Sequence, residues 1–90
     1  MKKLTTREHT LKTRAEYWDA LASGEKTFEV RRDDRGFQKG DILVLRRMRE
    51  SDPSLYDYEN KTLRCQITFI LTGGQLGIEP GHVIMGLRHA

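Results

Sequence analysis

The stretch Ser23–Asp41 has the sequence S-G-E-K-T-F-E-V-R-R-D-D-R-G-F-Q-K-G-D, and 10 of its 19 residues carry a charge. Phe28 and Val30 nevertheless alternate with polar residues, which is the period of a half-buried strand. Gly24 can adopt a positive φ and end a helix, and Lys39–Asp41 offers a tight turn. The stretch therefore predicts a helix end, a strand and a turn into the next strand. The polar face of this strand is either solvated or lines a ligand pocket.

The residues before this stretch predict a first strand over 5–11 and a short helix over 14–22. Thr13 and Glu16 have the spacing of a capping box at the start of the helix. Apolar side chains at helical spacing share one helix face, and these are Tyr17, Trp18, Leu21 and Ala22. Of these, we expect the tyrosine in the core and the tryptophan at the edge of a cleft.

The remaining strands are predicted at 27–32, 41–49, 61–71 and 82–88. Alternation along the strand at 61–71 predicts an inward face of Leu63, Cys65, Ile67, Phe69 and Leu71. The cysteine is therefore interpreted as a small core residue rather than a reactive thiol. The order strand, helix and four strands predicts an α+β, mainly β fold, a small barrel of about five strands with one helix across one opening.

Composition and charge indicate one domain over residues 1–90 and narrow its possible partners. Hydrophobic runs are too short to span a bilayer, so we expect no membrane association and a cytoplasmic location. A single cysteine and three scattered histidines predict no disulfide, no metal site and no cofactor. The net charge is +3, and residues 1–49 hold 13 of the 16 basic side chains. This distribution suits an anionic partner such as RNA or a nucleotide, although a merely soluble surface would also explain it.

Charged side chains converge on the predicted second strand. Glu29 and Arg31 are two residues apart and share a face, while Lys26 lies at the start of the strand. Asp34 and Arg35 follow in the loop. One acid among several bases can bind a polar planar ligand and its phosphate. The alternative is ion pairing on a solvated face.

These residues resemble a known signature. The segment Gly24–Arg31 matches the G-x-K-x-x-E-x-R motif of the ASCH domains, members of the PUA-like superfamily. The resemblance is strongest to a small single-domain subfamily of bacteria and their phages. It extends to the segments His9–Lys12, Asp34–Arg35, Phe37 and Gly40–Leu45. Asp33 is a departure, since the subfamily usually has Asn there.

The resemblance implies a PUA-like barrel with a cleft between helix and barrel, and a function linked to RNA or to modified nucleotides. The expected ligand-binding residues are His9, Lys12, Lys26, Glu29, Arg31, Asp34 and Arg35. The alternatives are a packed position for His9 and an exposed position for Lys12. A protein partner and the oligomeric state are left open.

The resemblance also implies possible enzymatic activity. Some ASCH proteins resemble amidohydrolases that remove an acyl group from modified cytidine, or small ribonucleases. The amidohydrolase type uses Lys, Thr and Glu; Lys26 matches the lysine, but Glu29 occupies the position of the threonine. If the chain is an enzyme, Lys26 and Glu29 are the expected catalytic residues. Three hypotheses result: a binding module for RNA or a nucleotide, a hydrolase, and a phage-type protein that binds a host factor.

Overall fold

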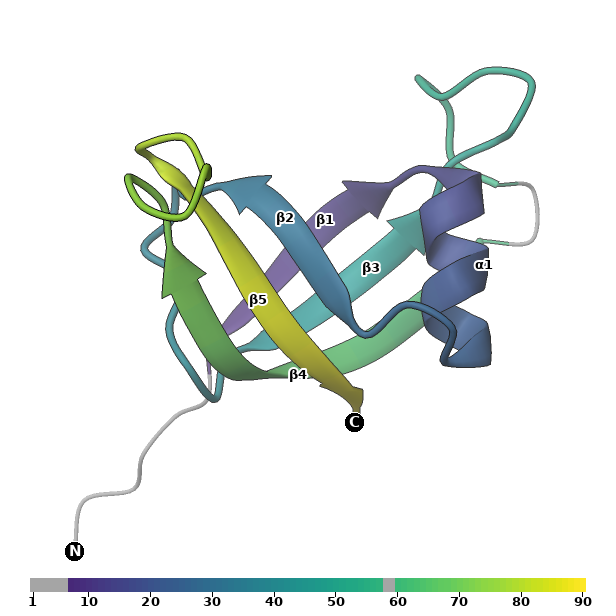
Figure 1. The fold of residues 1–90 in the computed structure, drawn as a ribbon. Helices are drawn as coiled ribbons and strands as arrows, with labels where there is room; N and C mark the ends of the chain where they lie inside the picture. Colours follow the sequence, from purple (N-terminus) through teal and green to yellow (C-terminus); the bar gives the residue numbers. More distant parts are fainter. Residues whose placement is uncertain (1–6, 58–59) are drawn as a thin grey trace, which may run out of the picture.

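The computed structural model describes residues 7–57 and 60–90, and there the chain is mainly β with one helix (Figure 1). The elements are β1 (Glu8–Thr13), α1 (Ala15–Ser23), β2 (Phe28–Arg32), β3 (Ile42–Arg47), β4 (Thr62–Thr72) and β5 (His82–His89). Their order confirms the predicted fold class. The first strand ends two residues later than predicted, and residues 5 and 6 of that prediction lie outside the described residues. Within those residues, no helix is long and apolar enough to cross a membrane.

The five strands form a curled sheet, an open half-barrel, in the order β1-β3-β4-β5-β2. β1 runs parallel to β3, and the other neighbouring pairs are antiparallel. β1 and β2 are therefore the two edges of the sheet. Figure 1 shows how the curl brings β2 in front of β1, with α1 at one end of the sheet. A seam between two edge strands is the consequence.

The core fills the concave side of the sheet. Its buried residues are Leu11, Leu21, Phe37, Leu43, Leu45, Cys65, Ile67, Val83, Met85 and Leu87. The cysteine is confirmed as a core residue, because it is fully buried on β4. Burial, and then the nearby charge of Glu29, raises the pKa of the Cys65 thiol. β2 contributes no apolar side chain to this cluster, which sets this strand apart.

A β-bulge at Thr68 changes the face of the second half of β4. Ile67 pairs with Leu87, yet the next pair is Phe69 with Gly86, so one residue is extra. Beyond the bulge Ile70 packs against the core, whereas Phe69 is 64% exposed. The predicted inward positions of Phe69 and Leu71 were therefore wrong, because an inserted residue moves every later side chain to the opposite face.

The two aromatic residues of α1 have positions opposite to those predicted. Trp18 packs against the core and donates from Nε1 to the Leu45 carbonyl at 2.9 Å, whereas Tyr17 is 45% exposed. The predicted capping box was also wrong. Thr13 is the buried last residue of β1, and the N-cap is Arg14, which has no side-chain capping bond. The predicted C-terminus is confirmed, since Gly24 caps α1 with φ 85°.

Arg47 fastens α1 to the sheet. Its guanidinium donates to both carboxylate oxygens of Asp19, at 2.8 and 3.0 Å, and to Asp57 in the following loop. The hydrogen bond from Arg47 holds the pKa of Asp19 below its usual value. This fork fixes the helix beside the end of β1, because Arg47 is paired in register with Thr13.

The bulge makes a testable distinction between two neighbouring apolar residues. Ile67→Ala should destabilise the fold by roughly 2–5 kcal/mol, because it leaves a cavity in the core. Phe69→Ala removes a larger side chain but should leave the melting temperature nearly unchanged, because the ring lies on the exposed face. Denaturant unfolding of both variants measures this, and an equal loss would place Phe69 in the core.

Candidate ligand-binding cavity at the sheet seam

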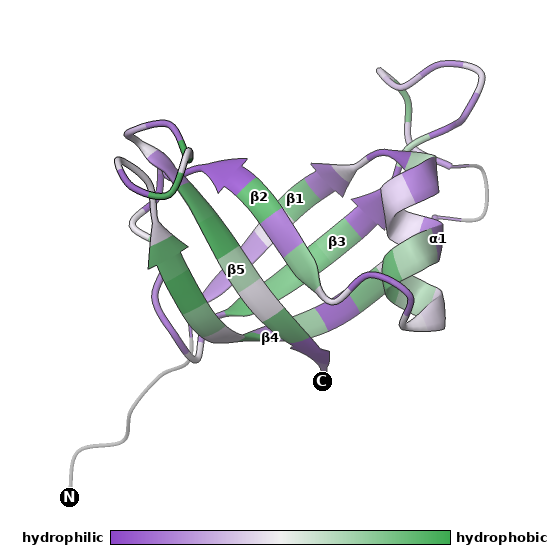
Figure 2. Cartoon of the chain, viewed as in Figure 1, coloured by the Kyte–Doolittle hydropathy of each residue, from purple (hydrophilic) through white to green (hydrophobic). Residues whose placement is uncertain are grey.

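β2 presents Glu29 and Arg31 to the interior of the half-barrel, and its apolar residues and Arg32 to the outside. Glu29 is paired in register with the buried Met85 and is only 4% exposed. Phe28 and Val30, on the opposite face, are each nearly half exposed. Figure 2 shows the resulting alternation of hydrophobic and hydrophilic residues along β2. The charged face of this strand is therefore the inner one.

Two cations hold the Glu29 carboxylate. Lys26 Nζ lies 2.8 Å from Oε1, and Arg31 Nε lies 2.9 Å from Oε2. Lys26 also donates to the Phe28 carbonyl at 2.7 Å. A buried carboxylate is tolerated only when it is paired and hydrogen-bonded, and here each oxygen has its own cationic donor. The predicted convergence of these three side chains is thus present.

Arginine side chains span the seam between the two sheet edges. Arg31 reaches from β2 to β1, where Nη2 donates to the Lys12 carbonyl at 2.7 Å and approaches the Thr13 hydroxyl at 3.4 Å. Arg35 donates to the Thr10 carbonyl at 3.2 Å. In the described part of the chain β1 and β2 share no ladder of backbone hydrogen bonds. Side chains thus bridge the two sheet edges where backbone pairing stops.

A cavity of about 540 Å³ opens at this seam. Its lining residues are Lys12, Thr13, Arg14, Tyr17, Lys26, Phe28, Glu29, Val30 and Arg31. Four of these side chains are basic and one is acidic, so the cavity favours an anion. The aromatic rings beside them offer flat apolar surface. A ligand that combines negative charge with a planar ring suits both features.

Lys26 lies at the centre of this arrangement. Its ammonium is 5.2 Å from the centroid of the Tyr17 ring and 4.9 Å from that of Phe28. Both distances are within the range of cation–π attraction. Together with the bond to Glu29, these contacts hold the ammonium against the cavity wall.

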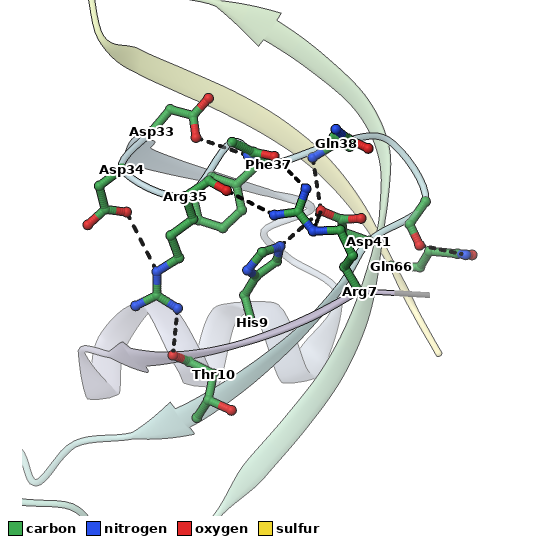
Figure 3. A network of polar contacts seen from close by, with 12 residues as sticks. Arg7, His9, Thr10, Asp33, Asp34, Arg35, Phe37, Gln38, Asp41 and Gln66 are labelled. Atoms are coloured by element: carbon green, nitrogen blue, oxygen red, sulfur yellow. Dashed lines mark hydrogen bonds and ion pairs between the residues drawn. The ribbon is translucent and has the colours of Figure 1, made fainter. Parts of the chain in front are cut away.

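The cavity brings together four of the seven residues predicted from the sequence, namely Lys12, Lys26, Glu29 and Arg31. The other three belong to a second polar network, which Figure 3 shows. There His9 Nε2 lies 2.9 Å from Asp41 Oδ2, and the His9 ring packs edge-on against Phe37. Asp34 and Arg35 form an ion pair at 3.6 Å. These three residues are outside the cavity lining.

Asp33 also has a structural contact in this network. Its Oδ1 accepts a hydrogen bond from the Phe37 backbone N–H at 3.0 Å, which shapes the loop after β2 (Figure 3). An asparagine side-chain oxygen could accept the same bond. The departure from the ASCH pattern at this position therefore preserves the loop contact.

Sequence reasoning missed several residues of the cavity wall, among them Thr13, Arg14 and Tyr17. The sequence held a signal for Thr13, because this residue continues the alternation of His9 and Leu11. In the structure all three are buried, and β1 extends to Thr13. Tyr17 carried no comparable signal. The helical period gives its face, but the partner of that face depends on the tertiary structure.

The buried carboxylate gives a prediction with a matched control. Glu29→Gln keeps the shape but leaves Lys26 and Arg31 facing each other without their anion. The free energy of unfolding should therefore fall by roughly 3 kcal/mol. Glu8→Gln also breaks a bond to an arginine, Arg64, but that pair is exposed, and its melting temperature should barely change. Thermal and urea unfolding compare the two variants. Equal effects would show that the Glu29 pair is no different from a surface salt bridge.

Comparison with known proteins gives two matches. Residues 8–87 match the family described as "Domain of unknown function (DUF3850)". A segment of 37 residues is 40% identical to the "Uncharacterized 12.9 kDa protein in GpA 3'region" of Escherichia phage P2. That segment is 41% of this chain and 34% of the phage protein, so the match spans about a third of that relative. The family match covers β1, α1 and β2 to β4 completely and β5 as far as residue 87, and the chain belongs to the DUF3850 family.

Proposed function

We propose that this chain is a PUA-like module of the ASCH type that binds RNA or a nucleotide in the cavity at the seam. The observation that carries the proposal is the composition of the cavity wall. Four basic side chains surround one buried, fully paired carboxylate, and exposed aromatic rings lie beside them. Phosphate and nucleobase are the two ligand parts that such a wall complements.

Each part of the wall has a role in this proposal. Lys12 and Arg14, at the rim, attract the phosphate, and the Tyr17 ring offers a face for the base. Glu29 fixes Lys26 and Arg31 rather than contacting the ligand, since both of its oxygens already accept hydrogen bonds. Lys26 donates to the Phe28 carbonyl and to Glu29 Oε1, which uses two of its three N–H groups. The third is the donor that it can offer to a bound base.

The sequence resemblance supports the same conclusion independently of the geometry. The residues of the G-x-K-x-x-E-x-R motif that contribute to the cavity are Lys26, Glu29 and Arg31, so the motif and the cavity coincide. In the ASCH domains this motif accompanies proteins linked to RNA and nucleotides. The basic first half of the chain contains the whole of the cavity wall.

A hydrolase is the second candidate, and one contact favours it. Thr13 lines the cavity together with Lys26 and Glu29, so residues that can supply a nucleophile, a cation and a carboxylate border the same space. An acyl group on a modified cytidine would be the substrate, with Lys26 stabilising the developing oxyanion. Incubation of the protein with N4-acetylcytidine, followed by chromatography, tests this. Release of acetate that is lost in Thr13→Val would establish turnover, whereas intact nucleoside at equilibrium would leave the binding function.

The binding proposal predicts which surface cations matter. Lys12→Ala and Arg14→Ala should each weaken binding of short RNA by several-fold, because each removes a phosphate partner at the rim. Lys39→Ala makes the same change of charge outside this cavity and should leave affinity nearly unchanged. Fluorescence anisotropy with a labelled RNA measures all three dissociation constants.

The salt dependence of the same assay gives a second readout. Binding to a phosphate backbone releases counterions, so affinity should fall steeply between low and high salt. The slope of log affinity against log salt should be shallower in Lys12→Ala than in the wild type. A flat salt dependence would point to a neutral small ligand or a protein partner and would end the RNA proposal.

A further inference from the structure

Two exposed phenylalanines flank a glycine on the outer face of the sheet. Phe28 on β2 and Phe69 on β4 are both paired in register with Gly86 on β5, which lies between them. Side chains of directly paired residues project from the same face of a sheet. Phe28 is 43% and Phe69 64% exposed, so both rings stand on the convex side, and β5 places no side chain between them. The three residues form what we call the aromatic slot.

The dimensions of the aromatic slot fit one flat ring. Neighbouring strands are about 4.8 Å apart, so residues on strands two apart stand about 10 Å apart. A planar ring held by carbon contacts on both faces needs roughly 7–8 Å, since each contact is about 3.5–4.0 Å. The side chains of Phe28 and Phe69 can close that difference by leaning inward. Any side chain at position 86 would occupy the same space.

The bulge in β4 creates the aromatic slot. Without the extra residue at Thr68, the alternation set by Cys65 and Ile67 would direct Phe69 into the core. A β-bulge often re-aims a side chain beside a functional site. Gly86 is also constrained, because an added Cβ would lie 3.1 Å from the Thr68 hydroxyl. The bulge thus keeps one ring outside, and the Thr68 hydroxyl lies beside the glycine at the floor of the slot.

The surroundings of the aromatic slot indicate the kind of ligand. Phe28 lines the seam cavity as well as the slot, so this residue borders both. Arg32 lies on the same face of β2 as Phe28, and Arg88 lies on the same face of β5 as Gly86; both are exposed. Exposed aromatic rings beside arginines are typical of surfaces that bind single-stranded nucleic acid.

We propose that the ligand is single-stranded RNA of at least two nucleotides, one base in the seam cavity and a neighbouring base between Phe28 and Phe69. This inference rests on the proposed function and names its substrate as an oligomer. The strand would cross the edge of β2, with its phosphates near Arg32 or Arg88. The base in the aromatic slot is held by stacking, which tolerates any base because each has a π-face.

The test compares mononucleotides with short oligomers. Calorimetry of the wild type with the four 5′-mononucleotides and with homo-oligomers of two to four nucleotides should show a gain in affinity of about tenfold or more on adding the second nucleotide. Phe69→Leu, which is apolar but not flat, should lose that gain and keep the mononucleotide affinity. Phe69→Tyr should retain the gain. Leu76→Ala, a change at another exposed apolar residue, should behave like the wild type.

The outcomes separate this inference from the proposed function. Mononucleotide binding without a gain for oligomers would overturn the slot and leave the cavity function intact. No binding of any oligomer or mononucleotide would overturn both. Equal affinities in Phe69→Leu and Phe69→Tyr would overturn stacking as the contact. Sedimentation showing a dimer of the wild type that dissociates in Phe69→Leu would overturn the inference in favour of a second copy on this face.

Discussion

The pairing of Glu29 with Lys26 and Arg31 is the constraint on which this arrangement depends. A carboxylate inside a half-barrel requires cationic partners on both oxygens, and these come from different places. Lys26 belongs to the loop that leaves α1, whereas Arg31 belongs to β2 and extends to β1. One buried charge therefore determines the relative positions of the helix exit and both sheet edges.

The open seam follows from the same constraint. In a closed barrel the edges satisfy each other's backbone groups, and little is left for a ligand. Here Arg31 and Arg35 satisfy carbonyls of β1 through their side chains, so the gap stays wide enough for a cavity. Arginine suits this task because its planar fork can serve a carboxylate and a carbonyl at once. The fold thus keeps its edges satisfied without closing them.

Much of this structure could be predicted from local patterns. Periods of two and 3.6 residues gave the order of elements, and the charged strand with its motif gave Lys26, Glu29 and Arg31. The bulge could not be predicted, because it is defined by the pairing of β4 with β5 and leaves no trace in composition. The hydrogen bond of His9 was equally hard to predict, because its partner, Asp41, is 32 residues away in the sequence. Both features depend on contacts between segments that only the assembled sheet brings together.

Thr13 and β2 illustrate two further limits. A threonine three residues before a glutamate satisfies the pattern of a helix cap, yet strand pairing with β3 determined its role. For β2, alternation showed that two faces differ but could not show which one is internal. Hydrophobicity alone would place Phe28 and Val30 inside, and the buried ion pair reverses that choice.

The position of β2 also affects how the protein is made. Among the described strands its one neighbour is β5, so β2 cannot pair until the chain has been synthesised through β5, that is residues 33–89. At elongation rates of about 5–20 residues per second that interval is roughly 3–11 s, during which β2 is an unpaired strand. Exposed strands with low charge tend to add to the edges of other chains, and charged side chains oppose this. The residues that make the seam polar in the folded protein therefore also protect β2 from aggregation on the ribosome.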